Sequence, residues 1–194
     1  MRILVAYATR HDGTAQIAHV LGSVLREQAG GDGQPVVDVR VVDDVDDLET
    51  YDAVLLGSAV YMDRWLHASR HFAQSNAKAL TKRPVWLFAS GPVGEPPGAL
   101  TESPETAQLA EAVGARGYRT FAGRLRTSNL AAIERARIRV AHVADGDYRD
   151  WHEIRAWAEE IGDALVVSSQ GSSQACAIRQ QQVGGRHESA RLPR

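Results

Sequence analysis

The sequence ILVAYATRHDGT, at residues 3–14, contains the junction that decides the fold. Five apolar residues, 3–7, lead directly into a polar loop that holds Gly13 and ends at Thr14. Apolar residues then recur at helical spacing, at Ile17, Val20, Leu21, Val24 and Leu25. A strand buried on both faces of a parallel sheet is a continuous apolar run, and here such a run precedes a helix. The stretch therefore predicts a strand–loop–helix unit of an α/β protein.

Similar apolar segments recur along the chain, separated by longer stretches of helical period. The five predicted strands are residues 3–7, 36–42, 53–57, 85–89 and roughly 118–122. Short apolar strands that alternate with helices are typical of βαβ units in one parallel sheet. At 194 residues the chain is expected to form a single domain.

Two later helices also have recognisable patterns. The helix in the third crossover is predicted from Trp65, Leu66, Ser69, Phe72 and Ala73. The last helix is predicted to begin at Asp150, which together with Glu153 resembles a capping box. Its apolar stripe, expected to pack in the core, consists of Trp151, Ile154, Trp157 or Ala158, Ile161 and Leu165.

Composition and charge exclude several classes of function. The net charge is −2, and the last segment, from Ser168 onward, holds four arginines and one glutamate, so the remainder carries −5. Such a body lacks the basic surface of a nucleic-acid-binding protein. A single cysteine, Cys176, excludes an internal disulfide, and no His/Cys/carboxylate cluster has metal-ligand spacing. The amino-terminal apolar run is too short for a signal peptide or a membrane span, so a cytoplasmic protein is expected.

Two segments depart from the regular alternation. Residues 123–147 look like an insertion before the last helix, and five of them are arginines against one glutamate in the part from Gly123 to Ala144. Residues 168–194 are rich in Ser, Gln, Gly and Arg, with few apolar residues, and are expected to be a disordered tail. The predicted domain therefore spans residues 1–167.

The loops after three strands carry the candidate chemistry. In an open parallel sheet, ligands bind outside the carboxyl ends of the strands. The first loop offers the hydroxyls of Thr9 and Thr14, the guanidinium of Arg10 and the amides of a helix amino terminus, which suit a monophosphate. The alternative is structural: Thr14 caps the helix and Gly13 only makes the turn. Neither a GxxxxGK[ST] nor a GxGxxG motif is present.

The second and third loops are rich in small and aromatic residues. The second, residues 57–65, begins at Gly57, and its Tyr61 and Trp65 offer faces on which a flat ring can stack. The third, residues 89–97, is small and turn-rich. Three such loops at neighbouring strand ends point to a ligand site more specifically than any one of them.

Three stretches resemble the FMN-binding loops of the flavodoxin-like superfamily: YATRHDGTAQIA, LLGSAVYMDRWL and WLFASGPVG. More narrowly, the chain resembles the bacterial FMN-dependent protoporphyrinogen oxidase branch, over about residues 1–167, including FAGRL at 121–125 and GDYRDW at 146–151. The resemblance implies a three-layer α/β sandwich with a five-stranded parallel sheet in the order 2-1-3-4-5. It also implies that FMN is bound by Thr9, Arg10, His11, Asp12, Gly13, Thr14, Ser58, Ala59, Val60, Tyr61, Trp65, Ser90, Gly91, Pro92, Val93 and Gly94.

The first loop departs from the superfamily pattern at two positions. That pattern is [ST]-x-T-G-x-T, and here His11 replaces the middle Thr and Asp12 replaces the Gly. A carboxylate beside a phosphate is repulsive unless it points away. Three outcomes are open: Asp12 faces solvent with Arg10 and His11 offsetting its charge, FMN is bound weakly, or the FMN site is lost.

Three functions remain open at the level of sequence. The first is an oxidoreductase of the protoporphyrinogen-oxidising type that passes electrons to a quinone or another acceptor. Its basic 123–147 segment would dock a carboxylate-bearing flat substrate such as a porphyrin, or contact a membrane surface; the structural alternative is a solvated amphipathic segment. The second is a flavodoxin-type electron carrier, and the third a binding module without FMN. Because the flavin carries the redox chemistry, no general acid, base or nucleophile is expected from the chain.

Overall fold

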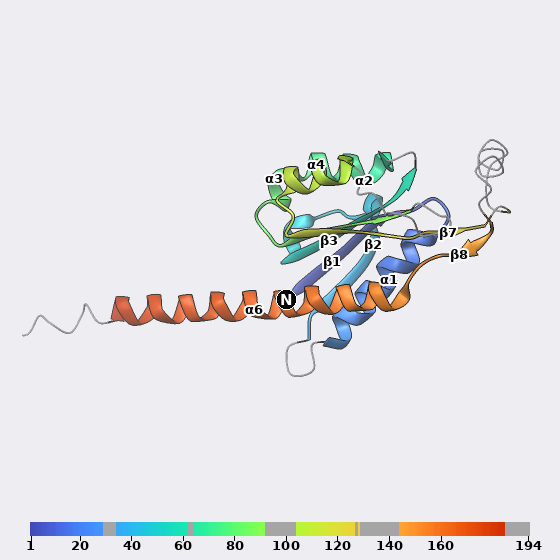
Figure 1. Cartoon of the computed structure of the whole chain (residues 1–194). Helices are drawn as coiled ribbons and strands as arrows, with labels where there is room; N and C mark the ends of the chain where they lie inside the picture. The colour runs from blue at the N-terminus through green and yellow to red at the C-terminus, as the bar shows by residue number, and fades with distance from the viewer. Residues whose placement is uncertain (29–33, 62–63, 92–103, 127, 129–143, 185–194) are drawn as a thin grey trace, which may run out of the picture.

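The computed structural model describes residues 1–28, 34–61, 64–91, 104–126, 128 and 144–184, and its centre is a parallel sheet (Figure 1). Five strands form the sheet in the order β2-β1-β3-β5-β6. Their bounds are β1 Arg2–Ala8, β2 Val36–Val41, β3 Ala53–Tyr61, β5 Val85–Ser90 and β6 Gly117–Phe121. The predicted fold class and strand order are therefore confirmed, because these are the five predicted strands in the order 2-1-3-4-5.

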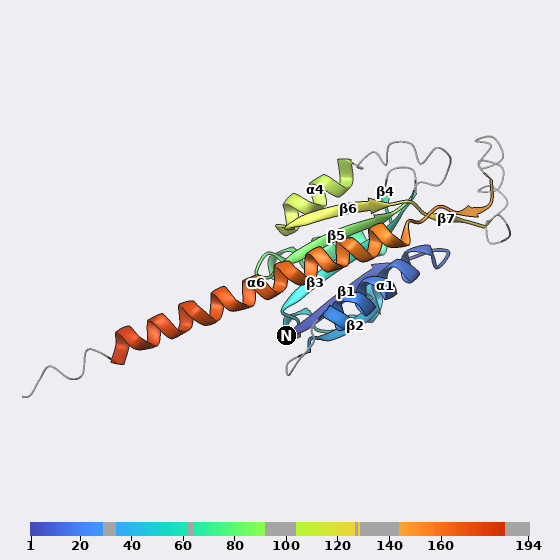
Figure 2. The same cartoon turned by 60° about the horizontal axis from the view of Figure 1, so that its bottom comes forward.

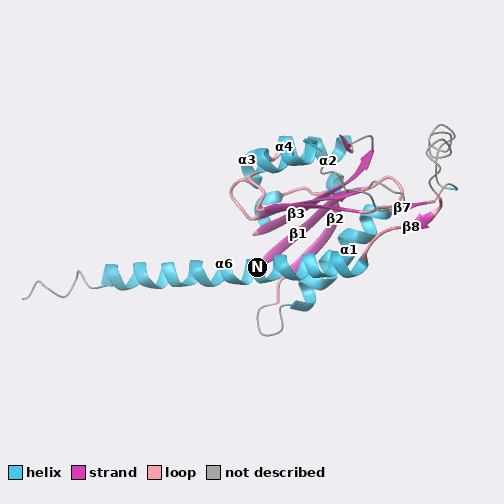
Figure 3. Cartoon of the chain, viewed as in Figure 1, coloured by secondary structure: helices cyan, strands magenta, loops and turns pink. Residues whose placement is uncertain are grey.

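Helices cover both faces of this sheet, which makes three layers (Figures 2 and 3). One face is covered by α1 (Gly13–Gln28) and α6 (Trp151–Gly184), and the other by α2 (His67–Ser75), α3 (Ala77–Leu80) and α4 (Pro104–Val113). Two short 3-10 helices, Val42–Asp44 and Leu48–Thr50, lie between β2 and β3. Because side chains of a strand alternate between faces, Val5 packs with α1 and α6, whereas Leu4 and Ala6 pack on the opposite side.

Three short strands lie outside the predicted pattern. β4 (Arg64–Trp65) pairs antiparallel with the end of β3, which runs four residues beyond the predicted Gly57. β7 (Arg124–Leu125) and β8 (Gly146–Asp147) pair antiparallel with each other, apart from the main sheet. They join the two ends of the predicted insertion, so its base is a two-stranded ladder. Residues 127 and 129–143 lie outside the described residues.

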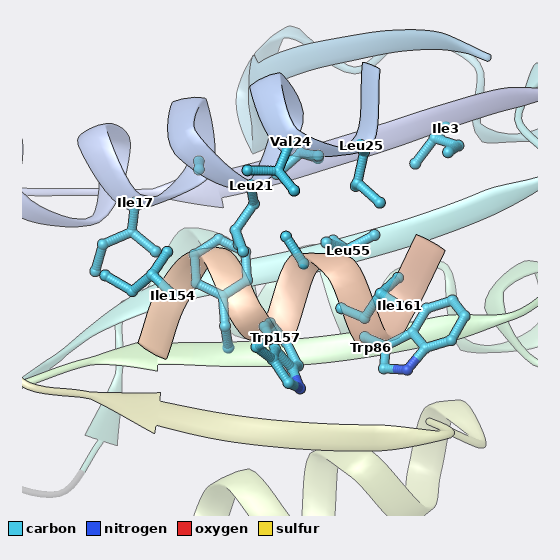
Figure 4. Packing of buried hydrophobic residues seen from close by; sticks show 14 of the residues in the cluster. Ile3, Ile17, Leu21, Val24, Leu25, Leu55, Trp86, Ile154, Trp157 and Ile161 are labelled. Atoms are coloured by element: carbon cyan, nitrogen blue, oxygen red, sulfur yellow. The ribbon is translucent and has the colours of Figure 1, made fainter. Parts of the chain in front are cut away.

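The core between the sheet and the α1–α6 layer follows the predicted stripes closely (Figure 4). Ile154, Trp157, Ala158, Ile161 and Leu165 of α6 are all buried against α1 and the sheet. Trp151 is a correction, since its side chain is 36% exposed and it is not part of the buried cluster. It stands at the first position of α6, one turn before the buried stripe, and its ring lies against the Arg149 guanidinium instead, at 4.3 Å.

The start of α6 agrees with the predicted cap, and its end does not agree with the predicted tail. The Asp150 carboxylate accepts hydrogen bonds from the amides of His152, at 2.9 Å, and Glu153, at 3.1 Å. The helix continues through Gly184, so residues 168–184 are helical where the sequence predicts disorder. No proline interrupts the sequence between Trp151 and Gly184, which allows the helix to continue. In Figures 1 and 2 the last part of α6 extends well beyond the sheet.

No helix in the described part of the chain is both long enough and apolar enough to cross a membrane.

Candidate functional site

The β1–α1 loop, residues 9–14, contains two buried hydroxyls without a partner. The Oγ1 atoms of Thr9 and Thr14 are buried, and no hydrogen-bond partner for either lies among the described residues. Thr14 as a whole is 1% exposed. Buried polar groups are nearly always hydrogen-bonded, because leaving one unpaired costs about 1–3 kcal/mol. Two such groups in one loop, at a helix amino terminus, could both donate to a ligand with acceptor oxygens.

Asp12 gives this loop its turn. Its φ angle is 59°, and it is the one non-glycine residue of the described part with a positive φ. That region of backbone space favours glycine, and Asp and Asn are the residues that tolerate it best otherwise. Asp12 is exposed, and its carbonyl accepts a hydrogen bond from the Gln16 amide at 3.1 Å, which starts α1. Asp12, an exposed residue, therefore adopts the backbone conformation that glycine would usually provide.

Two arginines from the base of the insertion donate to carbonyls of the same loop. Arg124 contacts the His11 carbonyl at 3.4 Å and the Gln16 side chain at 3.2 Å. Arg149 donates to the Gly13 carbonyl at 3.1 Å, and its side chain is 1% exposed. These contacts bring positive charge to the start of α1 from residues more than 100 positions away.

Asp147 holds Arg149 in place through a two-pronged ion pair. Arg149 Nε and Nη2 lie 2.7 and 2.5 Å from the two carboxylate oxygens of Asp147. This hydrogen bonding is the main cause that lowers the pKa of Asp147 below its ordinary value of 3.8. The other side of the Arg149 guanidinium is occupied by Trp151, whose ring centre lies 4.3 Å away.

The second predicted loop reaches the first through Tyr61. The rings of His11 and Tyr61 meet edge to face, with centroids 6.3 Å apart, and the Arg10 guanidinium lies 5.6 Å from the Tyr61 ring centre. Tyr61 is partly exposed, and Val60 beside it is also partly exposed. The structure thus brings three predicted residues, Arg10, His11 and Tyr61, into one cluster.

Trp65 and Ser58 are buried and hydrogen-bonded within the fold, and Trp65 lies in β4, before α2 begins at His67. Trp65 is 2% exposed, packs in the core on the α4 side, and donates its indole N–H to Thr106 at 2.8 Å. The prediction that Trp65 offers a stacking face is therefore corrected. The Ser58 hydroxyl is fully buried; it accepts from the Leu66 amide and donates to the Ala59 carbonyl, both at 2.9 Å. Ala59 is also buried, at 8% exposed.

The third loop begins beside the other two. A Cβ atom on Gly13 would lie 4.0 Å from the hydroxyl of Ser90. Gly91 has a φ of 126°, and a Cβ atom there would lie 3.1 Å from the Val60 carbonyl oxygen, so only glycine is accommodated without strain. The predicted residues Pro92, Val93 and Gly94 lie outside the described residues. The described parts of all three loops therefore converge at the carboxyl ends of β1, β3 and β5.

A comparison with family models assigns the family. The sequence matches the model of the flavodoxin domain over residues 4–151. The chain belongs to the flavodoxin domain family. The superfamily that the three loops resemble is thus confirmed, whereas the narrower protoporphyrinogen oxidase branch is not supported by any of the comparisons. No curated protein matches the sequence.

Solved structures with the same fold include several redox proteins. A flavodoxin from the domain Archaea is 15% identical with a TM-score of 0.58, over 85% of this chain and 99% of that one. An oxidoreductase from Corynebacterium diphtheriae is 16% identical with a TM-score of 0.55, over 86% of this chain and 97% of that one. The rubredoxin oxygen:oxidoreductase of Desulfovibrio gigas is 14% identical with a TM-score of 0.56, and the match covers 86% of this chain but 36% of that one. At such identities the likeness establishes the flavodoxin fold.

Sequence reasoning did not predict that Arg124 and Arg149 contact the β1–α1 loop of this flavodoxin domain. Both belong to stretches, FAGRL and GDYRDW, that resemble the family; the sequence analysis gave Arg149 no role and counted Arg124 among the arginines of the basic segment that would dock a substrate. The clue available was their position: each lies at one end of the insertion, and chain ends of an insertion meet in space. Within the described ranges, no group of three or more His, Cys, Asp or Glu side chains could hold a metal ion.

Proposed function

We propose that this flavodoxin domain binds one FMN and transfers electrons with it. The phosphate would lie at the β1–α1 loop, and the isoalloxazine ring between Tyr61 and the start of the third loop. The observation that carries the proposal is that the buried hydroxyls of Thr9 and Thr14, at the amino terminus of α1, have no hydrogen-bond partner among the described residues.

The chemistry of the loop fits a phosphate group. A phosphate monoester only accepts hydrogen bonds, and the loop supplies donors: two threonine hydroxyls and the first amides of α1, where the helix dipole is positive. Arg10 adds a guanidinium at the surface, and Asp12 is an exposed residue. The first of the three outcomes considered for Asp12, a solvent-facing carboxylate, is the one that the structure supports.

The residues around Tyr61 suit the flat part of the cofactor. Tyr61 is the one aromatic side chain of the second loop with an exposed surface, because Trp65 is buried. When bound, FMN supplies reversible one- and two-electron transfer, and the protein orients the ring and sets its electrostatic surroundings. Arg10, which lies over the Tyr61 ring, would place a positive charge near the bound ring.

Titration with FMN and with riboflavin tests this proposal. The two ligands share the ring system and differ in the phosphate. We expect the fluorescence of both flavins to be quenched on binding to the protein. The dissociation constant of FMN should be at least about tenfold lower than that of riboflavin, as one or two added charge-assisted hydrogen bonds would give. Failure of the purified protein to bind either ligand would refute FMN binding and favour a binding module without a cofactor.

Of the two redox functions, an oxidoreductase is favoured over an electron carrier by the charge around the site. Carriers of the flavodoxin type tend to be strongly acidic around the flavin. Here Arg10 is exposed and Arg124 contacts the β1–α1 loop, whereas Arg64 is paired with Glu105 at 3.6 Å and Arg149 is paired with Asp147. The carrier remains the second candidate, because the match covers 99% of the length of a flavodoxin from the domain Archaea.

Substrate turnover separates these two functions. The narrower hypothesis, oxidation of protoporphyrinogen with a quinone as acceptor, rests on sequence resemblance alone. The FMN-loaded protein should then consume protoporphyrinogen and reduce a quinone in the same assay in which a known oxidase does. Absence of both activities, with the flavin still reducible by dithionite, would leave the electron carrier.

A further inference from the structure

We infer that Arg149, held by Asp147, is a positioning residue for the phosphate end of the site; this inference rests on the proposed binding of FMN. Neither residue is among the predicted FMN contacts. Arg149 acts on the β1–α1 loop through the Gly13 carbonyl, and no direct contact with the cofactor is required of it.

All three nitrogen atoms of the Arg149 guanidinium donate a hydrogen bond within the described part. One edge of its guanidinium faces the Asp147 carboxylate, with 2.7 and 2.5 Å contacts, and Nη1 faces the Gly13 carbonyl at 3.1 Å. The Trp151 ring covers one face of the plane at 4.3 Å. A guanidinium that is 1% exposed and bonded in three directions has a fixed orientation. It therefore acts as a rigid link between β8 and the first turn of α1.

The effect of Arg149 on the site depends on the peptide group that it contacts, between Gly13 and Thr14. Gly13 is the first residue of α1, and the peptide group that carries its carbonyl also carries the Thr14 amide. Because a trans peptide is planar, the N–H points opposite to the carbonyl. In the first turn of a helix these N–H groups point out of the amino terminus and lack partners in the helix. By bonding the carbonyl, Arg149 fixes the direction of the Thr14 N–H and strengthens it as a donor.

Thr14 contributes a second donor from the same residue. Its hydroxyl is one of the two partnerless hydroxyls of the loop, so the peptide that Arg149 orients belongs to a residue already implicated in phosphate binding. Arg124 makes the equivalent contact with the His11 carbonyl, at 3.4 Å, from β7. The β7–β8 ladder thus supports the loop at two carbonyls, and links the insertion between these strands to the phosphate end of the site.

Two variants weaken the link without placing a new group in the site. Arg149→Lys keeps the charge and loses the two-pronged geometry, and Asp147→Asn keeps Arg149 while removing the carboxylate that orients it. The matched control is Arg155→Gln, because the ion pair of Arg155 with Glu27, at 3.6 Å, is likewise a contact of a late arginine with α1 but does not touch the loop. For each protein the dissociation constants of FMN and riboflavin are measured, together with the urea unfolding midpoint. Asp147→Asn keeps the test informative if Arg149→Lys fails to fold, because the Asp147 side chain is 40% exposed.

The ratio of the dissociation constants of FMN and riboflavin separates an effect on the phosphate end from a general loss of structure, since a general loss weakens the binding of both ligands alike. We expect FMN binding to weaken about fivefold to tenfold in both variants, riboflavin binding to be unchanged, and the control to match the wild type. Variants that keep the wild-type preference for FMN, or that weaken both ligands equally, would overturn the inference and leave FMN binding intact. A wild-type protein that binds neither ligand would overturn both.

Discussion

At the scale of single residues, the partnerless hydroxyl of Thr14 allows stability and binding to be separated. Thr14→Val removes a buried hydroxyl that has no partner in the described part of the chain, so the free energy of unfolding should stay equal or rise. FMN binding should weaken about tenfold, because a donor to the phosphate is lost. Urea unfolding and FMN titration measure the two quantities.

The matched control for Thr14→Val is a second fully buried threonine. The Thr106 hydroxyl accepts the Trp65 indole N–H at 2.8 Å, so Thr106→Val strands a buried donor and should cost about 1–3 kcal/mol of stability. Its preference for FMN over riboflavin should stay as in the wild type. If Thr14→Val destabilised the protein as Thr106→Val does, the hydroxyl of Thr14 would have a structural role.

Asp12 combines a required backbone conformation with an unfavourable charge. Asp12→Asn keeps a side chain that tolerates a φ of 59° and removes the carboxylate beside the phosphate site. FMN should bind more tightly to this variant, and the gain should shrink as salt is added, because the repulsion acts through solvent. Asp12→Ala also removes the charge but should lose about 1–2 kcal/mol of stability to backbone strain. An affinity gain that is independent of salt would show that the charge is not the cause.

At the scale of elements, Gly57 fixes how β3 packs against its neighbour β5. A Cβ atom on Gly57 would overlap the ring of Phe88, which is fully buried. Gly57→Ala should therefore cost about 1–3 kcal/mol, the usual penalty for an overpacked core. Gly117→Ala in β6 is the control, because its Cβ atom would make an ordinary 3.6 Å contact with Trp86. Equal unfolding midpoints for the two variants would contradict this account.

Asp38 on β2 connects three segments and makes their stability depend on pH. Its carboxylate accepts the Tyr51 hydroxyl at 2.9 Å, which lowers its pKa below 3.8, and Arg2 at 3.1 Å adds to this effect. A lowered pKa gives stability that is present above the ordinary pKa and is lost as pH falls through the lowered one. Tyr51→Phe should therefore destabilise the protein near neutral pH and less at about pH 3, as urea midpoints would show. Tyr148→Phe, which removes a bond to a backbone carbonyl instead, should show no such convergence.

Elements were far easier to predict from the sequence than the contacts between them. All five strands follow from local apolar runs, and Asp150 caps α6 as its spacing predicts. Helical period alone could not tell that Trp151 precedes the buried stripe or that Trp65 turns into the core towards Thr106. Both outcomes depend on neighbours from other elements, which a local pattern does not contain.

At the scale of the whole molecule, the candidate site is made by residues that the chain order keeps far apart. Thr14, Tyr61, Ser90 and Arg149 come from four different parts of the sequence and meet at one end of the sheet. The superfamily loops made the first three predictable as a group. Arg149 was not predictable, because its contact with Gly13 spans 136 positions and depends on how α6 enters the fold.

The length of α6 gives the last prediction, which concerns the size of the domain. The buried residues of α6 in the described core end at Leu165, and the next two residues, Val166 and Val167, are 48% and 70% exposed. A chain that ends after Val167 keeps every contact described here for the core and the site. We therefore expect its free energy of unfolding to lie within about 0.5 kcal/mol of the full chain, as is usual for changes away from the core. Its FMN dissociation constant should also be unchanged, and a loss of either property would show that residues 168–194 belong to the folded domain.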